Sequence, residues 1–262
     1  MNRPLPRSEP LAALAIQRAR AVRKDVGYEH PTELPIEVLA HLRNALVRPA
    51  PTTGGRANIV RLGTRAIISV ADRLSAEARR WAIAHELGHL ETHSGAGYLG
   101  LCTGEDMLLD HLGSGQEQEA NAFAAELLMP EDLYKKRCDV ARVTWAPIRA
   151  LAADFQVSVT AAGLRFLAFT DDRVAVVSSK NGVVQWTFST RDFGPRLKKG
   201  ERLDPMSLAY DVFAKGRCSE VPETVDASAW VPNARDGSEV IEHLLPMSAY
   251  NTVLSLLWFP AK

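Results

Sequence analysis

The sequence has few cysteines, few aromatic residues and no excess of either charge. Its 262 residues contain three cysteines, 7% aromatic residues, and 31 Lys and Arg against 31 Asp and Glu. The cysteines, Cys102, Cys138 and Cys218, form no CxxC pair, which argues against a secreted disulfide scaffold and favours a reducing compartment. We expect all three to be buried apolar side chains. The zero net charge gives no compositional signal for nucleic acid or for anionic membranes.

Long hydrophobic runs are also missing. No stretch approaches the roughly 18 uncharged apolar residues of a membrane span, and the longest candidate is only 253–260. The apolar run at 11–16 is interrupted by Gln17 and Arg18 and is followed by no small-residue cleavage site, so it does not predict a signal peptide. We therefore expect a cytoplasmic protein with no membrane partner.

Helical spacing of apolar residues dominates the first half of the chain. The segments that we expect to be helices are 10–26, 35–47, 75–93, 116–129 and 130–134. Two β-rich runs, 57–62 and 65–70, are separated by Gly63 and Thr64, which predicts a hairpin. The segments 48–56 and 94–115 are rich in Gly, Pro or small residues and are expected to be loops.

The pattern of residues changes in the second half of the chain. Residues 147–155 and 160–169 predict two short helices with a helix-turn-helix outline, and β-branched strands follow at 173–178 and 183–189. Further elements are expected at 207–214 (helix), 239–245 and 252–259 (strands). The chain is therefore expected to be α+β, with domain boundaries that give 1–140, a helical hairpin at 141–171, and a β-rich C-terminal domain at 172–262.

The residues most informative about chemistry are His85, Glu86 and His89, which form an HExxH motif on the expected helix 75–93. Two histidines four residues apart on a helix differ by about 40° around the axis and about 6 Å along it, so both rings can reach one ion. Glu86 can reach a water on that ion without being a ligand itself, as a catalytic base does. The longer HExxHxxGxxH pattern is excluded because Thr92 and Gly95 stand at its last two fixed positions.

A catalytic zinc needs a third protein ligand. Glu117 is the best placed, because it begins a helix whose small alanines allow close approach to the HExxH helix. Glu119 is the alternative on the same helix, pointing about 200° away from Glu117, and His93 is one turn beyond His89, where we expect it to end the helix. Asn121, one turn after Glu117, is a candidate to orient a ligand histidine by a hydrogen bond.

Two segments together resemble the ImmA/IrrE family of bacterial metallopeptidases. They are RWAIAHELGH at 80–89 and EQEANAFAAELLMP at 117–130, of which the second is far more specific. The resemblance covers roughly residues 10–170, including the helical hairpin. It implies a mainly helical, zincin-like peptidase domain with a small sheet, in which His85, His89 and Glu117 hold zinc in a gluzincin-like His/His/Glu site and Glu86 is the base.

The resemblance also implies a function and partners. Family members cut an intracellular regulatory protein, often a helix-turn-helix repressor of the XRE type, and so induce a mobile-element or DNA-damage response. The C-terminal portion, about 90 residues, departs from the family, because it is short for the GAF-like sensor domain of longer members and matches none of its motifs. Its role is left open, with sensing of an activating partner or ligand as one candidate, and the loop 94–115 is a candidate lid over the cleft. Mn²⁺ and Fe²⁺ are alternatives to Zn²⁺, since a His₂Glu site accepts each of them.

Two questions stay open from the sequence. Four residues have the right chemistry to stabilise the oxyanion, namely Tyr98, His93, His111 and Tyr134, and nothing ranks them. The alternative function is a DNA-binding or scaffold regulator with a structural or vestigial zinc site. We do not expect specific DNA binding, because the would-be recognition helix, 160–169, carries a single basic residue, Arg165.

Overall fold

The structure is a computed structural model of the whole chain, and it describes all residues except 1–9, 52–54, 94–98, 104–114, 248–250 and 261–262. It is an α+β protein with two sheets and two compact units. The N-terminal unit comprises Ser8–Tyr134 and Leu151–Ala161, and the C-terminal unit includes Lys135–Ala150 and Ala162–Lys262. None of the described helices is long and apolar enough to cross a membrane.

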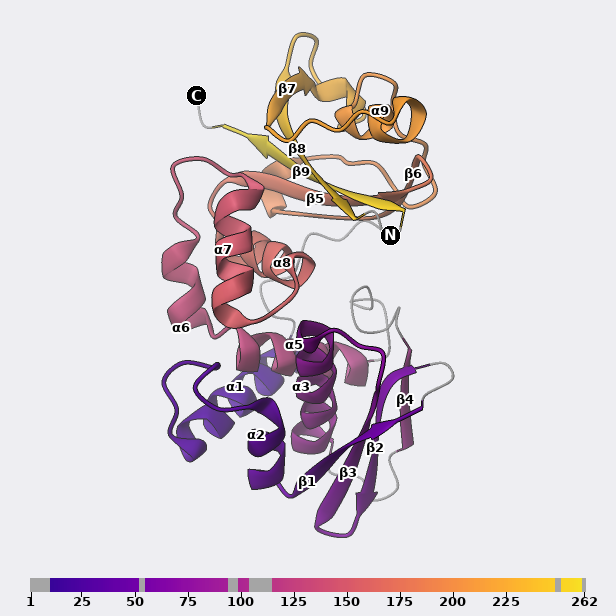
Figure 1. Cartoon of the computed structure of the whole chain (residues 1–262). Coiled ribbons are helices and arrows are strands. Elements are labelled where there is room, and N and C mark those ends of the chain that lie inside the picture. The colour runs from indigo at the N-terminus through magenta and orange to yellow at the C-terminus, as the bar shows by residue number, and fades with distance from the viewer. Residues whose placement is uncertain (1–9, 52–54, 94–98, 104–114, 248–250, 261–262) are drawn as a thin grey trace. The chain divides into compact units, whose positions relative to one another are not determined.

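The N-terminal unit combines helices with a four-stranded sheet. Its helices are α1 (Pro10–Val26), α2 (Ile36–Leu42), α3 (Ala76–Thr92), α5 (Gly115–Leu128) and α6 (Glu131–Tyr134). Its strands are β1 (Ala45–Ala50), β2 (Gly55–Leu62), β3 (Arg65–Ala71) and β4 (Leu99–Thr103), in the order β1-β3-β2-β4. Strand β1 is parallel to β3, and the other pairs are antiparallel. Helix α3 packs between this sheet and α5 (Figure 1).

The C-terminal unit is built on a five-stranded antiparallel sheet in the order β6-β5-β9-β8-β7. Its strands are β5 (Arg173–Lys180), β6 (Val183–Ser189), β7 (Glu223–Asp226), β8 (Glu239–Met247) and β9 (Thr252–Phe259). Its helical pieces are α9 (Leu208–Lys215) and the 3₁₀ turns η1 (Lys135–Arg137), η2 (Arg191–Phe193) and η3 (Ala227–Ala229). The predicted hairpin between β5 and β6 turns through Asn181 and Gly182, both with positive φ.

A buried carboxylate organises the core of the C-terminal unit. Glu242 on β8 accepts hydrogen bonds from the first two backbone N–H groups of α9, at Leu208 (2.9 Å) and Ala209 (3.0 Å). It also accepts one from the indole Nε1 of Trp230 at 2.8 Å. The acidic side chain therefore satisfies the N-terminus of a helix, where the helix dipole favours negative charge.

The predicted helical pair is present as α7 (Trp145–Phe155) and α8 (Val159–Phe169), joined through Gln156, which has a φ of 51°. Each of these helices runs from one unit into the other, because the units divide at Ala150 and again at Ala161. The chain therefore passes between the units within each helix of the hairpin, and also between Tyr134 and Lys135.

Several expectations about secondary structure were wrong. The expected helix 35–47 ends at Leu42, and β1 begins at Ala45, because Asn44 adopts a left-handed conformation (φ 61°) that ends the helix. The apolar residues that suggested a longer helix, Leu42 and Leu46, are 54% and 59% exposed. The expected loop 94–115 contains strand β4, and β7 was not expected at all.

The expectation for cysteine was correct for Cys138, which is buried, and wrong for Cys218, which is exposed. Burial raises the pKa of the Cys138 thiol to about 12. The side chain of Cys102 lies outside the described part of the structure.

Candidate metal centre

Helix α3 places the two histidines of the HExxH motif on one side, inside the protein. The helix begins at Ser75, whose hydroxyl accepts a hydrogen bond from the Ala78 N–H at 3.2 Å, as a capping serine does. The side chains of His85 and His89 are fully buried, and their Nε2 atoms are 3.1 Å apart. One turn of helix has therefore brought two imidazole nitrogens to a common point, as the spacing predicted.

Helix α5 brings a carboxylate to the same point. Glu117 in its first turn places Oε2 3.2 Å from Nε2 of His85, and Oε1 3.4 Å from Nε2 of His89. The close approach depends on Gly88, because a Cβ on this residue would lie 2.8 Å from the Cα of Ala120 on α5. The two small residues let the helix backbones meet, so the first turn of α5 reaches the histidines.

The three side chains have the spacing of a metal site. Two ligands held about 2.0–2.1 Å from a tetrahedral zinc are about 3.3 Å apart. The two histidine Nε2 atoms are 3.1 Å apart, and the two carboxylate oxygens of Glu117 approach them, Oε2 at 3.2 Å from His85 and Oε1 at 3.4 Å from His89. Among the described residues, these three form the group of His, Cys, Asp and Glu side chains that could hold one ion. Two imidazoles and a carboxylate suit a borderline metal such as zinc.

The pKa shifts of Glu117 and His89 also favour a metal. Hydrogen bonds from His85 and His89 hold the pKa of Glu117 far below its usual range. Burial lowers the pKa of His89 below 6.5. An ionised carboxylate and a neutral imidazole are the forms that bind metal, and an ion would take the place of these hydrogen bonds.

Of two further predicted residues, Asn121 contacts the site and Glu86 is buried on the helix that carries both histidines. Asn121 places Oδ1 3.0 Å from Nδ1 of His85, where it can accept the ring N–H and leave Nε2 directed at the centre of the group. Glu86 is fully buried on α3, directly after His85 in sequence. A buried carboxylate beside a group of two histidines and a glutamate is costly to retain without a role.

The structure separates His93 and Glu119 from the group of three. Neither belongs to it; instead, His93 Nε2 lies 2.8 Å from Oε2 of Glu119, and His93 Nδ1 lies 3.2 Å from Nδ1 of His89. Sequence reasoning missed this arrangement, although a histidine one turn beyond His89 was the signal for it. Of the other candidate oxyanion donors, Tyr134 is buried against Phe155. Tyr98 and His111 lie outside the described residues.

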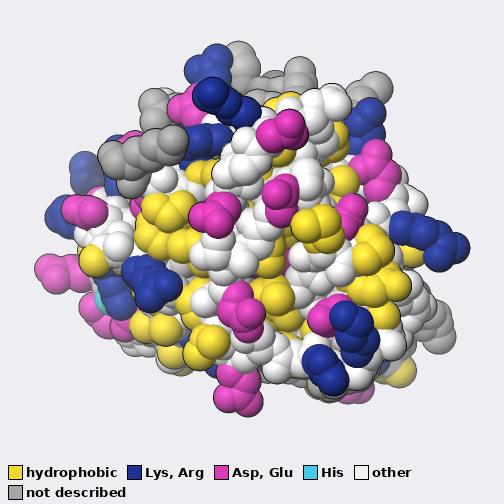
Figure 2. All heavy atoms as spheres, turned by 90° about the horizontal axis from the view of Figure 1, so that it is seen from above, with side chains coloured by type: hydrophobic (Ala, Val, Ile, Leu, Met, Phe, Trp, Pro, Cys, Tyr) yellow, Lys and Arg dark blue, Asp and Glu magenta, His cyan; other side chains and the backbone are white. Residues whose placement is uncertain are grey.

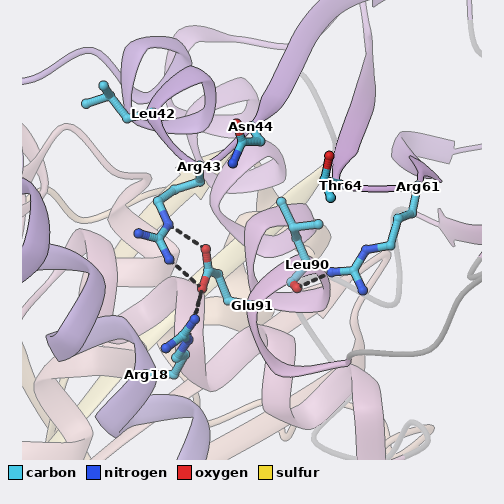
Figure 3. Close-up of a pocket in the computed structure, with 9 residues that line it drawn as sticks. Arg18, Leu42, Arg43, Asn44, Arg61, Thr64, Leu90 and Glu91 are labelled. Carbon is cyan, nitrogen blue, oxygen red and sulfur yellow. Dashed lines mark hydrogen bonds and ion pairs between the residues drawn. The ribbon is translucent and has the colours of Figure 1, made fainter.

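A cavity of about 320 Å³ lies near the C-terminal end of α3, away from the three donor atoms. Its wall contains Glu91, whose carboxylate accepts hydrogen bonds from Arg43 at 2.6 Å and from Arg18 at 2.9 Å (Figure 3). On the other side of the cavity, Arg61 of β2 donates to the Leu90 carbonyl at 2.6 Å. These arginines tie α1, the segment after α2, and β2 to the end of α3, so they fix the helix that carries the histidines.

Comparison with known proteins agrees with the resemblance seen in the sequence. Residues 44–167 match the family model of peptidase family M78, described as the IrrE N-terminal-like domain. The predicted resemblance to the ImmA/IrrE family is therefore confirmed for this part of the chain. No curated protein matches the chain.

A solved structure described as a Mycobacterium tuberculosis transcriptional regulator has a similar fold. It is 17% identical, with a TM-score of 0.58, and the match covers 96% of this chain and 76% of that one. At this identity the likeness concerns the fold alone. It extends over both units of the chain, whereas the family model ends at residue 167, within α8.

Proposed function

We propose that this protein is a zinc-dependent endopeptidase with a zincin-like N-terminal unit and a gluzincin-like site. In this proposal His85, His89 and Glu117 are the ligands, Asn121 orients His85, and Zn²⁺ is the metal, with Mn²⁺ or Fe²⁺ as alternatives. The observation that carries the proposal is the convergence of the two Nε2 atoms, 3.1 Å apart, with the Glu117 carboxylate, whose nearest oxygens lie 3.2 and 3.4 Å from them. The match to a peptidase family supports it independently.

The chemistry follows from the residues around this site. A bound zinc would supply Lewis acidity, polarising the scissile carbonyl and acidifying water. Glu86 removes the proton from the attacking water and then delivers it to the leaving amine nitrogen, so one carboxylate serves as base and as acid. Burial of Glu86 keeps this proton transfer away from bulk solvent. Asn121 keeps the His85 ring in the tautomer whose Nε2 can bind the metal.

The proposed substrate is an intracellular regulatory protein, specifically a helix-turn-helix repressor of the XRE type, cut in a stress or mobile-element response in the cytoplasm. Support comes from the match to the IrrE-like family model. The similar structure is described as a transcriptional regulator, and here regulation would act through proteolysis. Figure 2 agrees with this: on the face that it shows, Lys and Arg side chains lie among Asp and Glu side chains and form no continuous basic surface for DNA.

The experiment that tests this function compares the zinc-loaded wild type with Glu86→Gln. Each protein is incubated with an XRE-type repressor from the same organism, and the fragments are identified by mass spectrometry. The matched control is Glu77→Gln, which changes an exposed glutamate in the first turn of the same helix. We expect cleavage by the wild type and the control, and none by Glu86→Gln at equal zinc content.

The alternative function predicts a different outcome. A DNA-binding or scaffold regulator would retain its full regulatory effect on its target promoter in the Glu86→Gln variant, because its zinc site would be structural. Retained function without cleavage would therefore overturn the peptidase proposal.

A further inference from the structure

The side chains of His89, His93 and Glu119 form a continuous chain of polar contacts that leads away from the candidate metal site. Nδ1 of His89 lies 3.2 Å from Nδ1 of His93, and Nε2 of His93 lies 2.8 Å from Oε2 of Glu119. The two rings are 5.2 Å apart between centroids. The side chains of His93 and Glu119 are only 10% and 17% exposed, so the contacts are largely shielded from water.

The order of donors and acceptors in this series of contacts follows from His89 at one end and Glu119 at the other. At one end, Nε2 of His89 lies with the donor atoms of His85 and Glu117 and must be unprotonated to bind a metal. The proton of the neutral ring is then on Nδ1, and it donates to Nδ1 of His93. At the other end, a carboxylate can only accept, so His93 carries its own proton on Nε2 and donates it to Glu119.

We propose that His93 and Glu119 are a positioning pair that holds His89 in the tautomer and orientation required of a metal ligand. This inference rests on the proposed metal site. The pair acts through His89, and neither residue belongs to the group that could hold the ion. The ionised carboxylate of Glu119 ends this series of hydrogen bonds and makes His93 a better acceptor. His93 in turn makes His89 a more basic ligand.

The two ligand histidines are thereby supported in different ways. His85 is oriented by a neutral amide in one step, through Asn121 at 3.0 Å. His89 is oriented by a charged carboxylate in two steps, through His93. Asn121 and Glu119 both lie on α5, the helix that supplies Glu117. One helix therefore provides a ligand and also the groups that orient the two ligand histidines.

The backbone holds His93 firmly enough for this role. His93 directly follows the last residue of α3, and its N–H donates to the His89 carbonyl at 3.1 Å. Its own carbonyl accepts from Nη1 of Arg61 at 3.3 Å, while Nη2 of the same guanidinium binds the Leu90 carbonyl at 2.6 Å (Figure 3). An arginine from β2 therefore caps the helix end and prevents it from fraying. The imidazole of His93 is consequently presented from a fixed position.

The test measures zinc affinity by competition with a chromophoric chelator, in the full-length protein. We expect His93→Phe, which keeps a ring but removes the acceptor, to weaken zinc binding by about 10- to 100-fold. Glu119→Gln should fall at the lower end of that range, because the amide oxygen still accepts from His93 but has no charge. His93→Gln should restore most of the affinity, since its amide can accept from His89 and donate to Glu119.

Two controls separate positioning from a general structural role. His41→Phe changes an exposed histidine of α2 and should leave zinc affinity unchanged. The visible spectrum of the Co²⁺-loaded protein should change in His93→Phe and return towards that of the wild type in His93→Gln, because it reports the ligand field at the metal. A role limited to holding the helix end would lower the melting temperature of the metal-free protein and leave the Co²⁺ spectrum as it is.

The outcomes distinguish the failure of this inference from that of the proposed function. Wild-type affinity and spectrum in both His93→Phe and Glu119→Gln would overturn the positioning pair, while loss of zinc in Glu117→Ala would still support the metal site. Absence of zinc binding in the wild type would instead refute the proposed function, and the inference with it.

Discussion

The contact between Gly88 and Ala120 is the point where a single methyl group should affect both stability and metal binding. A Cβ added at Gly88 would lie 2.8 Å from the Cα of Ala120 and 2.9 Å from its carbonyl oxygen. Carbon atoms in normal contact are about 3.5–4.0 Å apart, so Gly88→Ala requires α3 and α5 to separate by about 1 Å. Both of these Ala120 atoms belong to the backbone, which cannot rotate away.

The expected change in the free energy of unfolding of Gly88→Ala is the difference between two effects. Overpacking costs about 1–3 kcal/mol, and the higher helix propensity of alanine returns about 1 kcal/mol. We therefore expect the free energy of unfolding to fall by up to about 2 kcal/mol, which lowers the melting temperature by up to about 8 °C. The same separation moves Glu117 away from His85 and His89, so zinc affinity should decrease by at least about tenfold.

Gly163→Ala is the matched control, because Gly163 also lies within a helix but has room for a methyl group. Its Cβ would be 3.5 Å from an aromatic carbon of Trp145 and 3.8 Å from Val176. This variant should gain about 0.5–1 kcal/mol from helix propensity. Both proteins are measured by thermal unfolding and by chelator competition. If Gly88→Ala matches Gly163→Ala in both assays, the argument for close helix packing at the site is wrong.

Three other predictions follow from buried polar groups and from the metal. Glu91→Gln should lower the free energy of unfolding in urea by about 1–3 kcal/mol, since this carboxylate is 6% exposed and binds two arginines; an unchanged midpoint would contradict this. Burial lowers the pKa of His243, whose Nδ1 accepts from the Trp145 N–H at 3.1 Å. Because the unfolded chain binds this proton first, stability should decline as the pH falls below 6.5. The decline should be smaller in His243→Gln, and equal slopes in the two proteins would refute the assignment. Finally, a metal chelator should lower the melting temperature of the wild type by removing about 2.7 kcal/mol of stabilisation at zinc concentrations about 100 times Kd, but should not affect Glu117→Ala.

The sequence predicted that His85, His89 and Glu117 lie together, because most of the geometry of this group is local. The relation between His85 and His89 depends only on the helix, and the capping Ser75 marks where this helix begins. The position of Glu117 relative to them depends on packing between α3 and α5, which the small residues of α5 indicated. Strong helical periodicity likewise predicted α1, and the Asn181-Gly182 turn predicted the hairpin of β5 and β6.

The features that were missed depend on contacts between distant residues. Strand β1 forms because it pairs in parallel with β3, which no local pattern around Leu46 reveals. Strand β4 has little β-branched character and exists through its pairing with β2. The contact of His93 with Glu119 joins residues 26 positions apart, and helical geometry alone had set Glu119 facing away from Glu117. In each case tertiary structure decides between local alternatives of similar energy.

The most direct test of the account is the metal content of the purified protein. The wild type is measured beside His89→Ala and Glu117→Ala, with Glu86→Gln and the exposed-site variant Glu77→Ala as controls. The account predicts about one zinc per chain in the wild type and in both controls, and loss of the metal in His89→Ala and Glu117→Ala. A wild type without metal, or a Glu117→Ala variant that retains it, would contradict the three-ligand site.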